Sequence, residues 1–447
     1  MARLRQSTTA TVIPPTTTST AVTQPTKATK AAKAAKAAKA AKATKATKAT
    51  KATKATKATA PSRKRAAPVR SRKSTTTTAT ATATTATTTA TTTTTATTTA
   101  ATTNTGSARV VAVTGAFGAL GRRLLARLEE DPTIDRIVAI DVRSGLSLLE
   151  DDDDDDHAAV LLKHPKLSAH TVDLTTPGTD RELADLLRAE GAGSLFHLAM
   201  LSTPTHHQEM AHELETVGTH YVLNATASAG IRRLVMLSST MCYGARPDNP
   251  AFLTEDHPLR PPPSRALKDK ADADKDASRF AAEHPDIAVC VARLGAMIPT
   301  ARDHFWTRTL SRRVVPAVLG YDPLMQFMHP DDGVAGLLAL WRAEARGPVN
   351  VVGRGYLPLS HILTRLERAP LYLPAGLGQS LVSALWQAQL IDMPPHFFGY
   401  LRWPWLADDR RLKSLTGFSA RHDIATVLTI LATERKHIPT RIDEASP

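Results

Sequence analysis

A run of β-branched residues that breaks into three regularly spaced glycines constrains this chain more than any other feature. Residues 109–121 read RVVAVTGAFGALG, so a short apolar strand precedes Gly115, Gly118 and Gly121 and a helical segment follows. In such a unit the first glycine makes a tight turn, the second lets backbone N–H groups approach a ligand, and the third lets helix and strand pack closely. Because a helix N-terminus attracts negative charge, the pattern predicts a dinucleotide pyrophosphate site. A glycine turn without a ligand is the alternative.

A second apolar strand, residues 136–141, ends in an acidic residue twenty positions after Gly121. A carboxylate at Asp141 can accept both ribose hydroxyls of NAD, and it would repel the 2′-phosphate of NADP. We therefore expect NAD as the cofactor and consider NADP less favoured, although Arg143 weakens this preference. The alternative for Asp141 is a turn residue at the end of a strand.

The composition changes abruptly at about residue 107. Residues 1–107 contain almost only Ala, Thr, Lys, Arg, Ser and Pro, with 19 basic residues and no acidic one. The chain has 56 Lys and Arg and 42 Asp and Glu, so the high net charge belongs to this tail and the remainder is mildly acidic. With so few apolar side chains the tail is predicted to be disordered. It could bind nucleic acid or another polyanion by releasing counterions, or it could be a solvated extension.

After residue 107, apolar strands alternate with helical segments, which is typical of a doubly wound parallel sheet. Strands are expected at 168–174, 194–200, 232–239 and 286–294, and helices at 180–190 and 207–229. The acidic run 150–156 reads as a solvated loop, and Cys242 and Cys290 read as buried, reduced thiols. We find no signal peptide and no long apolar segment, so we expect a cytoplasmic protein without a membrane partner.

Several of these segments together resemble the extended short-chain dehydrogenase/reductases of the NAD-dependent epimerase/dehydratase type. The resemblance covers nearly all of residues 108–447 and includes the glycine turn, residues 237–244 and residues 327–332. It implies a Rossmann-type domain at 108–294, a smaller C-terminal substrate-binding region at 295–447, and a homodimer. The cofactor contacts that it implies are Gly115, Phe117, Gly118, Ala119, Leu120, Gly121, Asp141, Asp173, Leu174, Leu198, Ala199 and Lys270.

The residues that carry the family's reaction are only partly present. Ser239 matches the serine that polarises the substrate oxygen, and Lys270 matches the lysine that holds the ribose. The tyrosine that acts as acid and base is replaced by Ala266, and Glu215 stands where the family has an asparagine. None of the six tyrosines is followed four residues later by lysine. A missing acid/base group costs a factor of about 10²–10⁴ in rate, unless another group substitutes.

Four side chains are candidates for that substitution, namely Glu215, Tyr243, His206 and His207. Arg308, Arg312 and Arg313 fall where related proteins contact a nucleotide diphosphate, although a solvated basic helix face explains them equally well.

Two functions follow. The first is an oxidoreductase or isomerase that acts on a hydroxyl or keto group of a sugar nucleotide or a similar small molecule. The alternative is a non-catalytic NAD-binding sensor or scaffold with a nucleic-acid-binding tail.

Overall fold

A seven-stranded parallel sheet organises the part of the chain that the computed structural model describes, which is residues 109–143, 164–201, 205–298, 305–391 and 393–434. The strands lie in the order β11-β6-β5-β4-β1-β2-β3. They are β1 (Val110–Thr114), β2 (Arg136–Asp141), β3 (Leu167–Thr171), β4 (Ser194–His197), β5 (Arg233–Ser239), β6 (Ala288–Leu294) and β11 (Gly347–Val351). Every neighbouring pair is parallel, which confirms the predicted doubly wound architecture.

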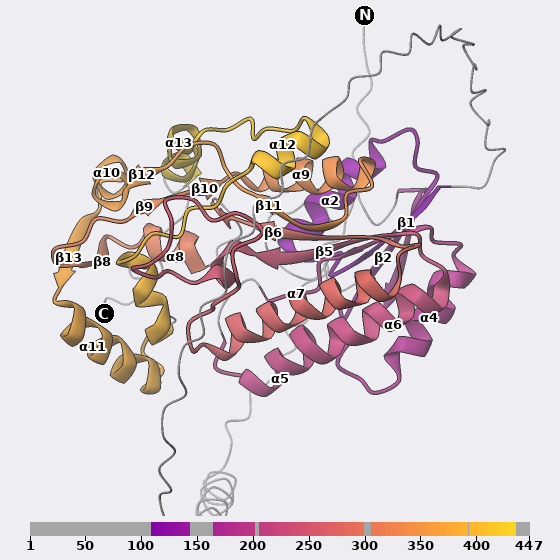
Figure 1. The fold of residues 1–447 in the computed structure, drawn as a ribbon, viewed down its shortest axis with the longest axis horizontal. Coiled ribbons are helices and arrows are strands. Elements are labelled where there is room, and N and C mark those ends of the chain that lie inside the picture. Colours follow the sequence, from indigo (N-terminus) through magenta and orange to yellow (C-terminus); the bar gives the residue numbers. More distant parts are fainter. Residues whose placement is uncertain (1–108, 144–163, 202–204, 299–304, 392, 435–447) are drawn as a thin grey trace, which may run out of the picture. The chain divides into compact units, whose positions relative to one another are not determined.

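Helices cover both faces of this sheet (Figure 1). Because side chains alternate along a strand, Val111 and Val113 of β1 belong to the apolar core on one face and Val110 and Ala112 to the core on the other. The first face packs against α2 (Ala119–Glu129), α9 (Pro330–Arg342) and α12 (Arg410–Thr416), and the second against α4 (Thr179–Ala189), α6 (Thr219–Ala229) and α7 (Arg265–Glu283). Burial on both sides explains why the strands read as continuous apolar runs.

Most of the predicted elements are present, with boundaries that differ by a few residues. The third strand ends at Thr171 instead of Leu174, and the fourth ends at His197 instead of Met200. The helix predicted at 207–229 consists of α5 (Gln208–His212), a π-helical turn η2 (Glu213–Gly218) and α6. The basic tail 1–107 and the acidic run 150–156 lie outside the described residues.

A third core, which contains several aromatic side chains, holds the C-terminal part of the chain next to η3 (Thr240–Tyr243), the turn that follows β5. Trp306 stacks on Trp405 with ring centroids 5.8 Å apart, and the Tyr400 hydroxyl donates to the Met241 carbonyl. The remaining elements are β7 (Ala296–Met297), α8 (Phe305–Ser311), β8 (Val314–Val318), β9 (Leu324–Met325), β10 (Phe327–Met328), β12 (Leu357–Pro358), α10 (Leu359–Arg365), β13 (Ala369–Leu373), α11 (Ala375–Gln387), η4 (Pro395–Leu401) and α13 (Ile424–Glu434). Among them, β8 pairs with β13 in parallel, and α11 follows β13 directly (Figure 1).

Both cysteines are buried and free, as the sequence predicts. Burial raises the pKa of the Cys242 and Cys290 thiols to about 12, so both stay protonated at neutral pH. Each helix in the described part of the chain is too short or too polar to cross a bilayer.

Candidate active site

The three glycines form the predicted turn between β1 and α2. Gly115 has a φ of +69°, and a Cβ on it would lie 2.6 Å from the backbone nitrogen of Ala199. A Cβ on Gly121 would lie 2.3 Å from the Gly115 carbonyl oxygen. Neither position can therefore hold a side chain without a shift of backbone. Gly118 is the N-cap of α2 and has no side chain to occupy the helix N-terminus, which leaves the first-turn N–H groups accessible to an anion.

Asp141 lies at the end of β2 and braces this turn. Its buried carboxylate accepts the Phe117 N–H at 2.9 Å and the Arg143 N–H at 3.1 Å. The Arg143 guanidinium Nε lies 3.5 Å from the same carboxylate. Asp141 thus lies beside the glycine turn, where a ribose could reach it, and it also has a structural role that the sequence pattern does not indicate.

Four other residues implied for the cofactor follow the ends of β3 and β4, at the same edge of the sheet as the glycine turn: Asp173, Leu174, Leu198 and Ala199. Leu198 donates its N–H to the Thr114 carbonyl at 3.0 Å, which places Ala199 beside Gly115. Leu174 is buried, whereas Asp173 is exposed and accepts the N–H and hydroxyl of Thr175 at 2.9 and 2.7 Å. The structure therefore brings the glycine turn, Asp141 and Ala199 together, with Asp173 in a local turn of its own.

Glu215 and Lys270 form a buried ion pair between η2 and α7. Lys270 Nζ donates to Glu215 Oε1 at 2.5 Å, and the Leu201 N–H donates to the same oxygen at 2.8 Å. Oε2 of Glu215 is also buried and has no hydrogen-bond partner among the described residues. Burial raises the pKa of Glu215, and the Lys270 charge offsets part of that rise. A carboxylate with a raised pKa and an unused oxygen is a stronger proton acceptor than an exposed one.

The π-helical turn carries Glu215 inside an otherwise α-helical segment. π-helical turns are rare and frequently mark functional sites. The turn is adjacent to α7, which bears Lys270, and Gly218 at its end packs against Leu174. Thr219 follows and donates its hydroxyl to the Glu215 carbonyl at 2.8 Å.

His197, at the end of β4, is buried close to this pair. Its Nδ1 lies 2.7 Å from the Thr114 hydroxyl and its Nε2 lies 3.2 Å from the Thr219 hydroxyl. Burial, with a smaller contribution from the Lys270 charge, lowers the pKa of His197 to about 4. His197 is therefore neutral at physiological pH and links β1, β4 and α6.

The two serines at the end of β5 have different environments. Ser239 accepts the Met241 N–H at 3.2 Å as the N-cap of η3, and its hydroxyl proton stays available. Ser238 is buried and donates to Asp274 at 2.8 Å. Asp274 in turn accepts Arg293 Nε and Nη2 at 2.9 and 2.7 Å.

Tyr243 belongs to the same buried network. It accepts a hydrogen bond from Arg293 Nη1 and donates one to Asn350 Oδ1, each at 2.8 Å. Its ring is fully buried, and burial raises its pKa to about 12. Because both hydrogen-bonding roles of its hydroxyl are already used, Tyr243 is poorly placed to act on a ligand.

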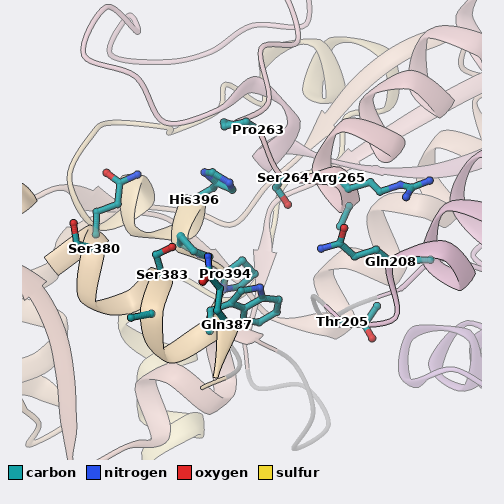
Figure 2. A pocket seen from close by; sticks show the side chains of 16 residues that line it. Thr205, Gln208, Pro263, Ser264, Arg265, Ser380, Ser383, Gln387, Pro394 and His396 are labelled. Carbon is teal, nitrogen blue, oxygen red and sulfur yellow. The ribbon is translucent and has the colours of Figure 1, made fainter. Parts of the chain in front are cut away.

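A cavity of about 900 Å³ opens beside the first turn of α7 (Figure 2). Gln208 and Ser264 lie on one side of it, and Ser383, Gln387 and His396 lie on the other.

Ala266, at the position of the missing tyrosine, also lines this cavity, as does Ala211 of α5. Lys270 and Glu215 each follow one of these alanines by four residues, which is one helical turn or its π-helical equivalent. The two charged residues therefore lie about one turn further along their helices, on the faces that carry the two alanines.

The two histidine candidates lie beside the cavity. The His206 ring stacks on Trp386 of α11, with centroids 3.8 Å apart and planes inclined by 24°. His207 is exposed and precedes α5. The stacked pair joins His206, which is exposed, to Trp386 of α11, which lines the cavity.

Known proteins resemble this chain in both sequence and structure. The "Uncharacterized protein Rv0501" of Mycobacterium tuberculosis is 29% identical over 318 residues, which are 70% of this chain and 80% of the relative. The 3-diazoavenalumate denitrifying reductase of a Streptomyces species is 30% identical over 189 residues, which are 40% of this chain and 60% of the reductase.

Among solved structures, dTDP-glucose 4,6-dehydratase from Bacillus anthracis in complex with NAD superimposes with a TM-score of 0.57 at 14% identity. The superposition covers 74% of this chain and 97% of the dehydratase. At that identity the similarity concerns the fold alone.

The model of the NAD dependent epimerase/dehydratase family matches residues 111–353, from β1 to just beyond β11. Because that match spans more than half of the chain, the protein belongs to the NAD dependent epimerase/dehydratase family.

Proposed function

We propose that the protein is an NAD-dependent oxidoreductase or isomerase in which the Glu215–Lys270 pair replaces the missing tyrosine as the proton-handling group. The observation that carries this proposal is the position of the pair. Glu215 and Lys270 lie one helical turn after Ala211 and Ala266, which line the cavity. The substrate would be a sugar nucleotide or a similar molecule with a hydroxyl or keto group, in line with the fold shared with dTDP-glucose 4,6-dehydratase.

The glycine turn fits a dinucleotide. Any side chain at Gly115 or Gly121 would collide with backbone, and Gly118 leaves the N-terminus of α2 open for a pyrophosphate. Asp141 supports NAD over NADP, because its carboxylate would accept ribose hydroxyls and repel a 2′-phosphate. NAD would supply the hydride acceptor or donor when bound.

We assign Glu215 the role of general base in the oxidative direction. In this direction Glu215 Oε2 accepts the proton of the substrate hydroxyl, and NAD, when bound at the glycine turn, would supply the hydride acceptor. Lys270 remains a protonated ammonium group that donates to Glu215 Oε1. Before the proton transfer, the two charges of the pair therefore cancel. Ser239 donates a hydrogen bond from its hydroxyl to the substrate oxygen, which stabilises the negative charge that develops there.

Replacement of Glu215 by Gln tests this role. Glu215→Gln is expected to lower kcat by a factor of about 10²–10⁴, the usual worth of an acid/base group, and to leave the NAD dissociation constant unchanged. Glu213→Gln is the matched control, because Glu213 lies in the same π-helical turn but is exposed. Net oxidation is followed by NADH absorbance and isomerisation by chromatography of the sugar products, with dTDP-glucose and UDP-glucose as substrates, and NAD binding is measured by calorimetry.

The two measurements separate the parts of the proposal. Full activity in Glu215→Gln would contradict the role of Glu215 as general base. It would not contradict the proposal that the protein binds NAD. Tight NAD binding without turnover of any nucleotide sugar would contradict the substrate class.

A non-catalytic NAD-binding sensor is the second candidate function. Ala266 at the tyrosine position favours it, since the Glu215–Lys270 pair would then only hold α7 against η2. The reductase name of the Streptomyces relative supports hydride transfer instead. A cytoplasmic location, a homodimer and nucleic-acid binding by residues 1–107 stay predictions.

A further inference from the structure

A second polar contact, between His212 and Asp269, lies beside the Glu215–Lys270 pair. His212 Nδ1 lies 3.1 Å from Asp269 Oδ1. Asp269 immediately precedes Lys270 on α7, and His212 precedes Glu215 by three residues. The helices α5 and α7, which carry His212 and Asp269, pack against each other (Figure 1). The proposed general base and its lysine therefore have an acid–imidazole pair next to them, which we call the His212–Asp269 dyad.

The two members of the dyad differ in their access to solvent. The Asp269 side chain is 7% exposed, whereas the His212 side chain is 37% exposed. Because a carboxylate only accepts hydrogen bonds, Nδ1 of His212 carries the hydrogen of this contact. The Thr216 hydroxyl lies 3.3 Å from the same nitrogen. Nε2 is then the nitrogen that takes up or releases a proton, and the partly exposed ring can exchange that proton with water.

The charge of Asp269 acts on Glu215. Burial is the main cause that raises the pKa of Glu215, and the negative charge of Asp269 adds to that rise, whereas the Lys270 charge opposes it. Arg265 lies one turn before Asp269 on α7, with its Nε 3.8 Å from Asp269 Oδ2, and offsets part of the Asp269 charge. Because charges interact strongly where water is excluded, a positive charge on His212 would offset the Asp269 charge further.

Other titratable groups on the elements that pack against η2 have less influence on Glu215. Side chains that reach the surface belong to Glu209, Glu213, His220, Lys268 and Asp272. Water and salt screen the charges of such exposed groups. His197 is buried, and burial lowers its pKa to about 4, so it carries no charge at neutral pH. The dyad, in contrast, joins a partly exposed imidazole to a buried carboxylate.

We propose that the His212–Asp269 dyad is a positioning unit that adjusts Glu215 to the pH of the solvent. While His212 is neutral, the Asp269 charge makes Glu215 hold a proton more firmly. When His212 is protonated, its charge cancels that of Asp269 and Glu215 releases its proton more readily, so the base stays usable at lower pH. This inference rests on the proposed function, because Glu215 is the general base there.

The pH dependence of kcat tests the dyad in the full chain, with NAD and dTDP-glucose or UDP-glucose. A general base loses activity as the pH falls through its pKa, which gives the profile an acid limb. Asp269→Asn removes a negative charge and keeps an oxygen for His212. Its acid limb is expected to move to lower pH by about one unit, the effect of a unit charge about 10 Å away at an effective dielectric constant of about 20.

The histidine variant is expected to act in the opposite direction. His212→Gln removes the charge that offsets Asp269, so its acid limb should move to higher pH, by up to about one unit. The double variant His212→Gln/Asp269→Asn should match Asp269→Asn, because His212 acts through Asp269.

Asp276→Asn is the matched control. Asp276 lies two turns further along α7 and pairs with Arg279 on the surface. The variant removes the same charge from the same helix, but water screens that charge, so the acid limb is expected to stay in place.

A readout without turnover separates this inference from the proposed function. In protein labelled with ¹³C at the glutamate carboxyl groups, the NMR signal that Glu215→Gln removes reports the protonation of Glu215. Its titration midpoint should move to lower pH in Asp269→Asn and to higher pH in His212→Gln. If neither nucleotide sugar is turned over, the proposed function fails, and these midpoints still decide the inference.

Three results would overturn the inference. They are limbs and midpoints that stay at the wild-type pH, shifts of both single variants in the same direction, and an equal shift in Asp276→Asn. Each would leave the dyad as a structural contact that holds α5 against α7. If Asp269→Asn does not fold, His212→Gln carries the test alone, since only a move to higher pH supports the dyad.

Discussion

Removal of Asp274 is expected to destabilise the protein strongly, because it would leave the buried Arg293 charge without its carboxylate. The two side chains are 1% and 6% exposed, and Arg293 makes two hydrogen bonds to Asp274. Asp274→Ala also removes the acceptor of the Ser238 hydroxyl. Loss of one partner of a buried ion pair costs about 3–5 kcal/mol of unfolding free energy.

The size of this effect follows from burial, so an exposed pair gives the matched control. Asp185 and Arg188 form an ion pair at 2.6 Å on the surface of α4, where both side chains are more than half exposed. Asp185→Ala is expected to cost less than about 1 kcal/mol. The double variant Asp274→Leu/Arg293→Met should cost less than Asp274→Ala alone, because it removes both buried charges.

Urea unfolding followed by tryptophan fluorescence measures these differences. The reasoning would be refuted if Asp274→Ala cost no more than Asp185→Ala, or if the double variant cost as much as Asp274→Ala alone. Unchanged NAD binding in folded Asp274→Ala would show that the network stabilises the fold without contributing to the cofactor site.

Three further predictions follow. His197 has a pKa of about 4 in the folded chain and about 6.5 when unfolded, so below pH 6.5 the unfolded state binds the extra proton. Its contribution of on the order of 3 kcal/mol is present above pH 6.5 and disappears as the pH falls towards 4, so His197→Gln should flatten the pH dependence of unfolding in that window. Gly118→Asp should abolish NAD binding in calorimetry, because it places a carboxylate at the helix N-terminus where the pyrophosphate would bind. The wild type should bind NADH more tightly than NADPH, and the reverse order would contradict the role of Asp141. Residues 1–107 carry 19 basic and no acidic residues, so the full chain should bind DNA with an affinity that falls steeply with salt, and residues 108–447 should not; equal binding by the two would contradict a role of the tail.

Much of the cofactor half could be predicted from local sequence. Strands buried on both faces consist of short apolar runs, and the glycine spacing places the turn between β1 and α2. The predicted ends of the strands were less accurate. Residues such as Val172 continue the apolar pattern beyond the last residue that pairs with the neighbouring strand. Its N–H still donates to the Asp141 carbonyl, although β3 ends at Thr171.

The ion pair between Glu215 and Lys270, beside the cavity, forms between segments that are distant in sequence. No local sequence pattern indicates such a contact. Glu215 and Lys270 are 55 residues apart, and the π-helical turn that carries Glu215 has no distinct apolar period. The sequence made Tyr243 a candidate for proton transfer, whereas partners 50 and 107 residues away hold its hydroxyl in a buried network. The ribose contact of Asp141 stays a prediction, and its hydrogen bond from the Phe117 N–H forms only in the folded turn.

The position of β11 has a consequence for how the chain can be divided. This strand comes from the C-terminal part of the sequence, yet it pairs along its whole length with β6, and α9 just before it covers one face of the sheet. A fragment that stopped at Leu294 would end in a strand whose seven residues are all buried in the whole protein, with one edge unpaired. Such an edge recruits other chains and aggregates. Because β11 completes the central sheet, we expect residues 108–294 expressed alone to aggregate, and we expect the N-terminal and C-terminal parts to be inseparable as modules.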